Sequence, residues 1–327
     1  MPIKKLNGDN RRRNKWEQRI KKAKKGIVRI VCRLHIITLN SSQNMKDRNN
    51  LSIPESENIE ALGDLWFDSK YDPQIRNPNY SSRGIKQYSK FRLDIFFNPQ
   101  KPYLPIFKIE IHPKADVSLE EYIFFLTFLA NRIPSLKVSK IEYAIDVFCK
   151  GPFYVSELFK LILKTIYVPY QRKYNEFGGN LNKGEPQSSV FRIGDQYKVY
   201  ERGDDDKKDG KGWNKKDFNR VRIENSVKRR TLKKSGIDTL TDFMKNPKFI
   251  ELNLRKWSFK DFKPSNILPG SWGLNFIFQK ELIDARKKTR GERKNFAQYI
   301  VDVQYMNFLS DQVNKAMRDF TKMWKAI

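Results

Sequence analysis

Apolar residues alternate with polar ones along several short stretches of the chain, a spacing that is typical of β-strands with one buried face. Charged residues interrupt Phe91–Phe97 and Pro105–His112 in this way, with Pro99 and Pro102 between the two stretches. From this pattern and the β-branched content, we predict strands over Ile27–Thr38, Phe91–Phe97, Pro105–His112, Lys140–Phe148, Val190–Tyr200, Arg220–Val227 and Phe249–Leu254. The stretch from the end of the first strand to Tyr88 is too irregular to assign.

Other stretches have the three- and four-residue spacing of amphipathic helices. Ser118, followed three residues later by Glu121, is a capping box that opens an apolar helix, and Pro134 ends that helix. We predict helices over Leu119–Arg132, Val155–Ile166 and Thr239–Lys245, and a long one from Asn295 to the end. The last helix carries an apolar stripe of Tyr299, Val303, Met306, Leu309, Val313, Met317, Phe320 and Trp324. Core packing is the favoured role of this stripe, and dimerisation is the alternative.

The order of these elements predicts an α+β fold, with an antiparallel-rich central sheet, helices packed on one face and a helical C-terminal region. We divide the chain into a basic N-terminal arm over residues 1–26, a central domain over residues 27–258 and a basic, helical region over residues 259–327. Pro264, Pro269 and Gly270 form a linker-like patch near the second boundary. The arm is either a clamp on a polyanion or a solvated tail.

The charge of the chain indicates its class of partner. The chain has 65 lysines and arginines against 37 acidic residues, a formal charge of +28 and a pI near 9.9. So many lysines and arginines favour a nucleic acid as the partner, because these side chains release the counterions that are condensed on phosphates. A solubility effect and an acidic lipid surface are the alternatives. No apolar run approaches the ~20 residues that span a bilayer, and the basic N-terminus does not resemble a secretory signal. We therefore expect a cytoplasmic protein without a membrane partner.

Cysteine and histidine offer little for metal binding or catalysis. Cys32 and Cys149 are too few for a disulfide framework or a CxxC zinc site. His35 and His112 lie far apart in sequence, without the HxH spacing of many single-strand nicking enzymes. Any divalent metal would therefore be held mainly by carboxylates, which suits Mg²⁺ or Mn²⁺.

Three carboxylates interrupt apolar strands and are the candidate metal ligands. Glu142 and Asp146 share one face of their predicted strand, about 13 Å apart along the chain, so they need not hold one ion. Glu224 lies on the strand Arg220–Val227. Ionised carboxylates among apolar residues need a paired cation or a metal. The alternative is a solvent-facing side of the sheet, with lysines and arginines as partners.

Tyr200 is the candidate nucleophile among 14 tyrosines. It ends a predicted strand beside Glu201 and Arg202, just before a charged, glycine-containing stretch. A neighbouring cation would favour the phenolate and hold a phosphate. Tyr197 is the weaker candidate, and a packed strand tyrosine is the common alternative.

Four segments, in order along residues 100–255, resemble the Rep_trans family of replication initiators from small rolling-circle plasmids of Gram-positive bacteria. These segments are Phe107–Pro113 (FKIEIHP), Lys140–Asp146 (KIEYAID), Tyr197–Gly203 (YKVYERG) and Arg220–Glu224 (RVRIE). Glu142 stands where the family commonly has Asp, and Arg202 where it has Lys. Arginine and lysine are not interchangeable at a phosphate.

The resemblance implies that the central domain nicks one DNA strand at an origin through Tyr200, with Arg202 beside it, and later rejoins the strand. It implies Glu142, Asp146 and Glu224 as ligands of Mg²⁺ or Mn²⁺, and a C-terminal region that recognises the double-strand origin near a hairpin or single-strand nick site. A homodimer and a host helicase partner rest on the resemblance alone. The expected DNA-contacting cations are Lys198, Arg222, Lys228, Arg229, Arg230, Arg286, Lys287, Lys288, Arg290, Arg293 and Lys294.

Two other functions fit the same sequence. A conjugative relaxase of the same superfamily would use the same tyrosine chemistry for DNA transfer. A DNA-binding protein without catalysis, such as a repressor, would explain the charge, but not the order of the carboxylates and the tyrosine.

Overall fold

The computed structural model confirms the predicted α+β class. It describes residues 18–42, 70–71, 79–88, 90–114, 117–133, 135–168, 174–175, 190–193, 196–202, 219–246, 257–262, 300–302 and 306–327. Within this part of the chain, no helix combines the length and the apolarity needed to cross a bilayer.

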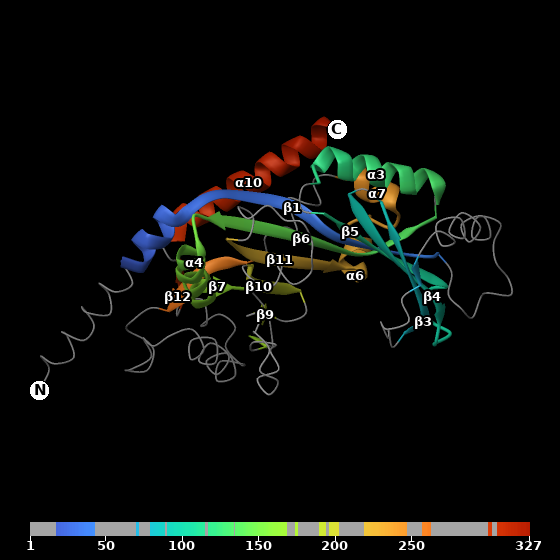
Figure 1. Cartoon of the computed structure of the whole chain (residues 1–327), viewed down its shortest axis with the longest axis horizontal. Coiled ribbons are helices and arrows are strands. Elements are labelled where there is room, and N and C mark those ends of the chain that lie inside the picture. The colour runs from blue at the N-terminus through green and yellow to red at the C-terminus, as the bar shows by residue number, and fades with distance from the viewer. Residues whose placement is uncertain are drawn as a thin grey trace, which may run out of the picture. The chain divides into compact units, whose positions relative to one another are not determined.

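A ten-stranded sheet is the main feature of the fold, in the order β2-β3-β4-β5-β1-β6-β11-β10-β9-β8 (Figure 1). Its strands are β1 (Ile27–Asn40), β2 (Lys70–Tyr71), β3 (Tyr80–Gln87), β4 (Phe91–Pro99), β5 (Phe107–Pro113), β6 (Lys137–Cys149), β8 (Tyr174–Asn175), β9 (Val190–Ile193), β10 (Tyr197–Arg202) and β11 (Arg220–Lys228). Pairing is antiparallel from β2 to β5, between β5 and β1, and from β11 to β8. A second sheet joins β13 (Ile300–Asp302), β12 (Ser258–Phe262) and β7 (Ile166–Tyr167).

The chain forms two compact units, and the long strands β1, β6 and β11 run through both. One unit comprises Met1–Cys32, Ile145–Asn225 and Arg255–Met317, and the other comprises Arg33–Ala144, Ser226–Leu254 and Arg318–Ile327. The helices are α3 (Leu119–Arg132), α4 (Pro152–Thr165), α6 (Arg229–Lys234), α7 (Leu240–Met244) and α10 (Asn307–Ala326).

In the second unit, α3 packs on the apolar face of β4 through aromatic rings. Phe91 stacks on Phe125 with ring centroids 4.2 Å apart, and it also contacts Tyr122 at 5.4 Å. The predicted capping box fixes the start of this helix, because Ser118 accepts from the Glu121 N–H and Glu121 accepts from the Ser118 N–H.

In the first unit, the described end of the N-terminal arm is a helix over residues 18–26 that packs on α4. Ala23 is fully buried, and Arg19 forms an ion pair of 3.2 Å with Glu157. Gly26 must be glycine, because a Cβ at this position would lie 2.4 Å from the ring of Tyr154. Its carbonyl accepts from the Lys150 N–H at 2.8 Å, which fixes the entry into β1.

Most predicted elements are confirmed, and two are wrong. Val190–Tyr200 is not one strand but the antiparallel pair β9 and β10, because the intervening Gly194-Asp195 is a turn signal that the prediction overlooked. The last helix begins at Asn307 rather than Asn295, since Ile300–Asp302 forms β13. The predictions for Phe249–Leu254, Tyr299 and Val303 lie outside the described residues.

Several described elements had no predicted counterpart, β3 and α6 among them, and the C-terminal stripe behaves as core. β3 was missed because its serines, lysine and glycine hide the strand pattern, and the short α6 was interpreted only as a basic cluster. The described stripe residues are buried, as predicted for core packing: Met306, just before α10, and Leu309, Val313, Met317, Phe320 and Trp324 on α10.

Candidate functional site

Two paired strands place Tyr200 opposite a buried arginine. In the antiparallel register of β10 and β11, Tyr200 pairs with Arg222 and Lys198 pairs with Glu224. Residues two apart on a strand share a face, so these four side chains lie on the same face of the pair. The alternation that buries Tyr197 and Val199 on the other face therefore directs Tyr200 to the polar face.

The hydroxyl of Tyr200 donates a hydrogen bond to Glu224 Oε1. Two cations contact the same carboxylate: Lys198 Nζ lies 3.5 Å from Oε2, and Arg222 Nη1 lies 3.7 Å from Oε1. Glu224 is nearly fully buried, so these partners offset the cost of its charge. Tyr200 thus has a proton acceptor and permanent positive charge beside its oxygen.

Asp146 binds Arg222 through both of its oxygens. Arg222 Nε and Nη2 donate to Asp146 Oδ1 and Oδ2 at 2.6 and 2.8 Å, and Arg220 Nε lies 3.4 Å from Oδ1. Burial lowers the pKa of Arg222, but the charges of Asp146, Tyr200 and Glu224 outweigh this effect and raise the pKa well above its ordinary value. Arg222 is therefore a fixed cation, and Asp146 is its counter-ion.

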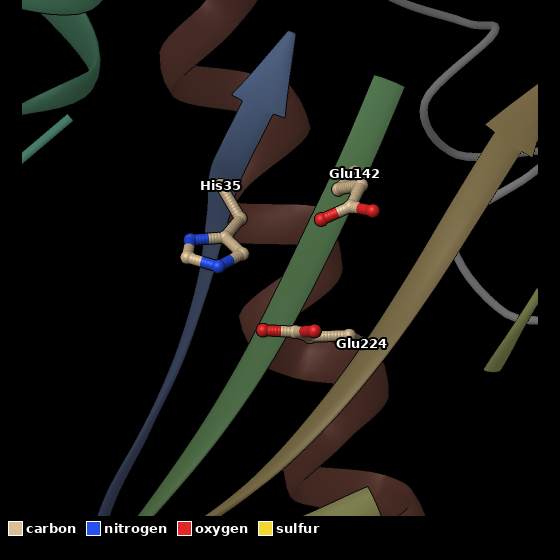
Figure 2. Close-up of side chains that lie close together, drawn as sticks. All are labelled: His35, Glu142 and Glu224. Atoms are coloured by element: carbon tan, nitrogen blue, oxygen red, sulfur yellow. The ribbon is translucent and has the colours of Figure 1, made fainter. Parts of the chain in front are cut away.

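Three neighbouring strands bring His35, Glu142 and Glu224 together (Figure 2). One ligand atom from each side chain lies within 4.8 Å of the others, and the residues come from β1, β6 and β11, which are adjacent in the sheet. Glu142 also accepts hydrogen bonds from Lys140 Nζ at 3.0 Å and from Ser226 Oγ at 2.9 Å. An imidazole and two carboxylates form a donor set that suits Mn²⁺ and accommodates Mg²⁺.

The structure joins two of the three predicted metal ligands and adds one that the sequence did not indicate. Glu142 and Glu224 share the group, whereas Asp146 is not part of it and binds the two arginines. His35 was overlooked because only HxH spacing was considered. The available signal was its position in the first predicted strand, as a polar residue between Leu34 and Ile36.

A second group on the sheet combines Asp94, Glu110 and His112, whose ligand atoms also lie within 4.8 Å of one another. Three cations already contact its carboxylates: Arg83 and Arg92 lie 2.7 and 3.1 Å from Asp94, and Lys108 lies 2.9 Å from Glu110. These ion pairs engage both oxygens of Asp94 and one oxygen of Glu110. We interpret this group as an ion-pair network.

The other predicted contacts lie in different settings. Lys228 and Arg230 are exposed, whereas Arg229 donates to Val138 O and Asp238 O, both at 2.9 Å. Arg202 ends β10 opposite Arg220, and its side chain is outside the described part. Also outside it are Arg286, Lys287, Lys288, Arg290, Arg293 and Lys294.

Replacing His35 by alanine should weaken metal binding at least ~tenfold, because a nitrogen donor is removed and the two carboxylates remain. Titration of Mn²⁺ followed by electron paramagnetic resonance measures the affinity directly, without DNA. His112→Ala is the matched control, since it removes the chain's other histidine from the second group. A loss of affinity with His112→Ala instead would place the ion at the second group.

Two glutamates should change stability in opposite directions when they are neutralised. Burial raises the pKa of Glu201, and Lys160 lowers it only in part. The folded state therefore binds the proton of Glu201 more tightly than the unfolded state does. The free energy of unfolding falls as the pH rises above 4.5, the ordinary pKa of this carboxyl. Burial raises the pKa of Glu110, but His112 and Lys108 outweigh this effect and bring the pKa to about 2. The charge of Glu110 therefore stabilises the fold above pH 4.5, and this stabilisation is lost as the pH falls toward 2. At pH 7, Glu201→Gln should raise the thermal unfolding midpoint and Glu110→Gln should lower it. If both variants shifted the thermal unfolding midpoint in the same direction, this account would be contradicted.

The chain is similar to solved structures, but to no family model. No family model and no curated protein matches the chain. A rolling-circle replication initiator protein from Geobacillus stearothermophilus is similar at 12% identity and a TM-score of 0.40, and the match covers 86% of this chain and 96% of that one. An identity and a TM-score this low establish no shared activity.

Proposed function

We propose that the protein nicks one strand of DNA by attack of Tyr200 on a phosphodiester and keeps the cut end as a covalent phosphotyrosine. The observation that carries this proposal is the hydrogen bond from Tyr200 to Glu224, within a group that also contains His35 and Glu142. A nucleophile, a proton acceptor and a potential metal site thus lie side by side, as phosphoryl transfer requires.

The first step transfers the phosphoryl group from the DNA to the enzyme. Glu224 accepts the hydroxyl proton of Tyr200, and the phenolate oxygen forms a bond to phosphorus. The bond from phosphorus to the 3′-oxygen breaks, and this oxygen takes up a proton and leaves as a 3′-hydroxyl. The other DNA end remains attached as a 5′-phosphotyrosine. The reverse reaction rejoins the strand without another energy source, because one phosphodiester replaces another.

His35, Glu142 and Glu224 would hold Mg²⁺ or Mn²⁺, whose charge would offset the negative charge that develops on the phosphate. Lys140 and Ser226 orient Glu142 through their hydrogen bonds. Lys198, half-exposed beside Glu224, lies where it could contact a DNA phosphate.

The biological role that fits this chemistry is initiation of rolling-circle replication, in which the freed 3′-hydroxyl primes synthesis. The formal charge of +28 and the sequence resemblance to the Rep_trans family support this role. In this proposal, residues 27–258 nick and rejoin DNA, residues 259–327 recognise the double-strand origin, and a homodimer recruits a host helicase. A nucleic-acid partner fits a cytoplasmic protein.

A pool of single-stranded DNA hairpins with randomised loops, incubated with the protein and Mn²⁺, tests the proposal without knowledge of the origin. We expect a protein–DNA adduct that survives denaturing detergent, together with a released fragment that a polymerase extends. Cleavage without an adduct would indicate attack by water. Binding without cleavage, across a pool that samples all loop sequences, would favour a non-catalytic DNA-binding protein.

A further inference from the structure

The short helix α6 follows directly on the end of β11 (Figure 1), and it carries a basic surface. Its members are the exposed cations Arg230, Lys233 and Lys234, and the exposed Lys245 follows α7 in the same unit. We call the first three residues the α6 basic surface. In α6, positions 230, 233 and 234 are three and four residues apart, so their side chains share one side of the helix.

The segment 228–246 contains two acidic residues, Asp238 and Asp242, and both have partners outside this surface. Asp238 binds Arg229, whose guanidinium also donates to two backbone carbonyls. Asp242 accepts from the Thr239 N–H at 2.8 Å and from the Asp238 N–H at 3.2 Å, where it caps α7. Arg229 is therefore an anchor, not a member of the surface.

The α6 basic surface is held in place by buried neighbours. Leu232, Ile237, Leu240 and Phe243 are fully buried or nearly so. Gly236, at a φ of 75°, makes the left-handed turn that ends α6, where the Ile237 N–H donates to Leu232 O at 3.0 Å. The exposed cations thus project from a fixed backbone, which lowers the entropy cost of binding.

We propose that the α6 basic surface binds the phosphate backbone of duplex DNA. It extends the proposed function, since it adds a duplex contact within residues 27–258 to the origin recognition assigned to residues 259–327. The cations match phosphates in charge and are not neutralised locally. The segment 228–246 does not favour single-stranded DNA, because its only aromatic residue, Phe243, is buried and the segment itself offers no ring for base stacking. The segment itself does not favour an acidic bilayer either, because its large apolar residues Leu232, Ile237, Leu240 and Phe243 are buried and cannot insert.

The salt dependence of duplex binding tests this proposal. The double variant Lys233→Gln/Lys234→Gln is compared with Lys101→Gln/Lys114→Gln, which removes the same charge from exposed positions elsewhere in the same unit. Binding to a random-sequence duplex is measured by fluorescence anisotropy over a range of salt concentrations, with chelator present. The association constant falls as the salt concentration rises, so the slope of its logarithm against log salt is negative. The magnitude of this slope should fall by about 0.9 for each phosphate that the variant no longer neutralises. We expect this fall for Lys233→Gln/Lys234→Gln and an unchanged slope for Lys101→Gln/Lys114→Gln.

Equal changes in the two double variants would overturn the proposal, since net charge alone would then explain them. Sedimentation with phosphatidylserine vesicles provides the second arm. Loss of vesicle binding without a change in the duplex slope would show a lipid surface and also overturn it. Neither measurement needs nicking or metal, so failure here leaves the proposed function standing, and a protein that does not nick can still show the expected slope.

Discussion

Tyr200→Phe should abolish both nicking and the covalent adduct, with a rate loss of roughly 10⁴-fold or more, as removal of a catalytic nucleophile typically causes. The substitution deletes one oxygen and keeps the ring, so β10 should keep its pairing with β11. The hydrogen bond to Glu224 disappears, but Lys198 and Arg222 still neutralise this carboxylate. Nicking of a selected hairpin, followed on a denaturing gel, measures the effect.

Tyr197→Phe is the matched control for this result. Tyr197 lies on the same strand, three residues earlier, but its side chain is buried on the opposite face. We expect its adduct yield to equal that of the wild type. Retained nicking in Tyr200→Phe, or loss only in Tyr197→Phe, would contradict the assignment of the nucleophile.

Asp146→Ala should lower the free energy of unfolding by about 3–5 kcal/mol, the usual cost of removing one partner of a buried ion pair. Arg220 and Arg222 both contact Asp146, and all three side chains are buried. Without this carboxylate, two guanidinium groups lose their shared counter-ion in a poorly solvated environment. Urea unfolding followed by circular dichroism provides the free energy.

Asp238→Ala provides the comparison for Asp146. It also removes a carboxylate from an arginine, but the Asp238 and Arg229 side chains are 40% and 31% exposed. Water can replace the missing partner there, so the expected loss is ~1 kcal/mol or less. If Asp146→Ala were no more destabilising than Asp238→Ala, Asp146 would not be the required counter-ion of the buried arginines.

Local sequence patterns predicted those elements whose signals lie within one segment. The capping box of Ser118 and Glu121 fixed the start of α3, and the alternation in Lys140–Phe148 identified β6. β3 was missed because its polar positions are set by pairing with β4, which a single sequence does not show. The start of α10 was misplaced because helical spacing continued through residues that form β13.

Only those residues of the candidate site could be predicted whose own strand marks them as unusual, such as a charge among apolar residues. Glu142 and Glu224 stood out as charges in apolar strands, and the structure brings them together. Neither His35 as their neighbour nor Arg222 as the partner of Asp146 could be predicted, because both depend on the order of β1, β6 and β11 in the sheet. The sequence alone left Asp146 as a metal candidate, and its contacts to two arginines favour a structural role.

The site of DNA attachment tests the central claim most directly. The adduct formed with a hairpin substrate is digested with nuclease and protease, and tandem mass spectrometry locates the residue that carries the nucleotide. We predict a nucleotide on Tyr200, linked through its 5′-phosphate. A nucleotide on Tyr197 or on any other residue, or a linkage through a 3′-phosphate, would contradict the account.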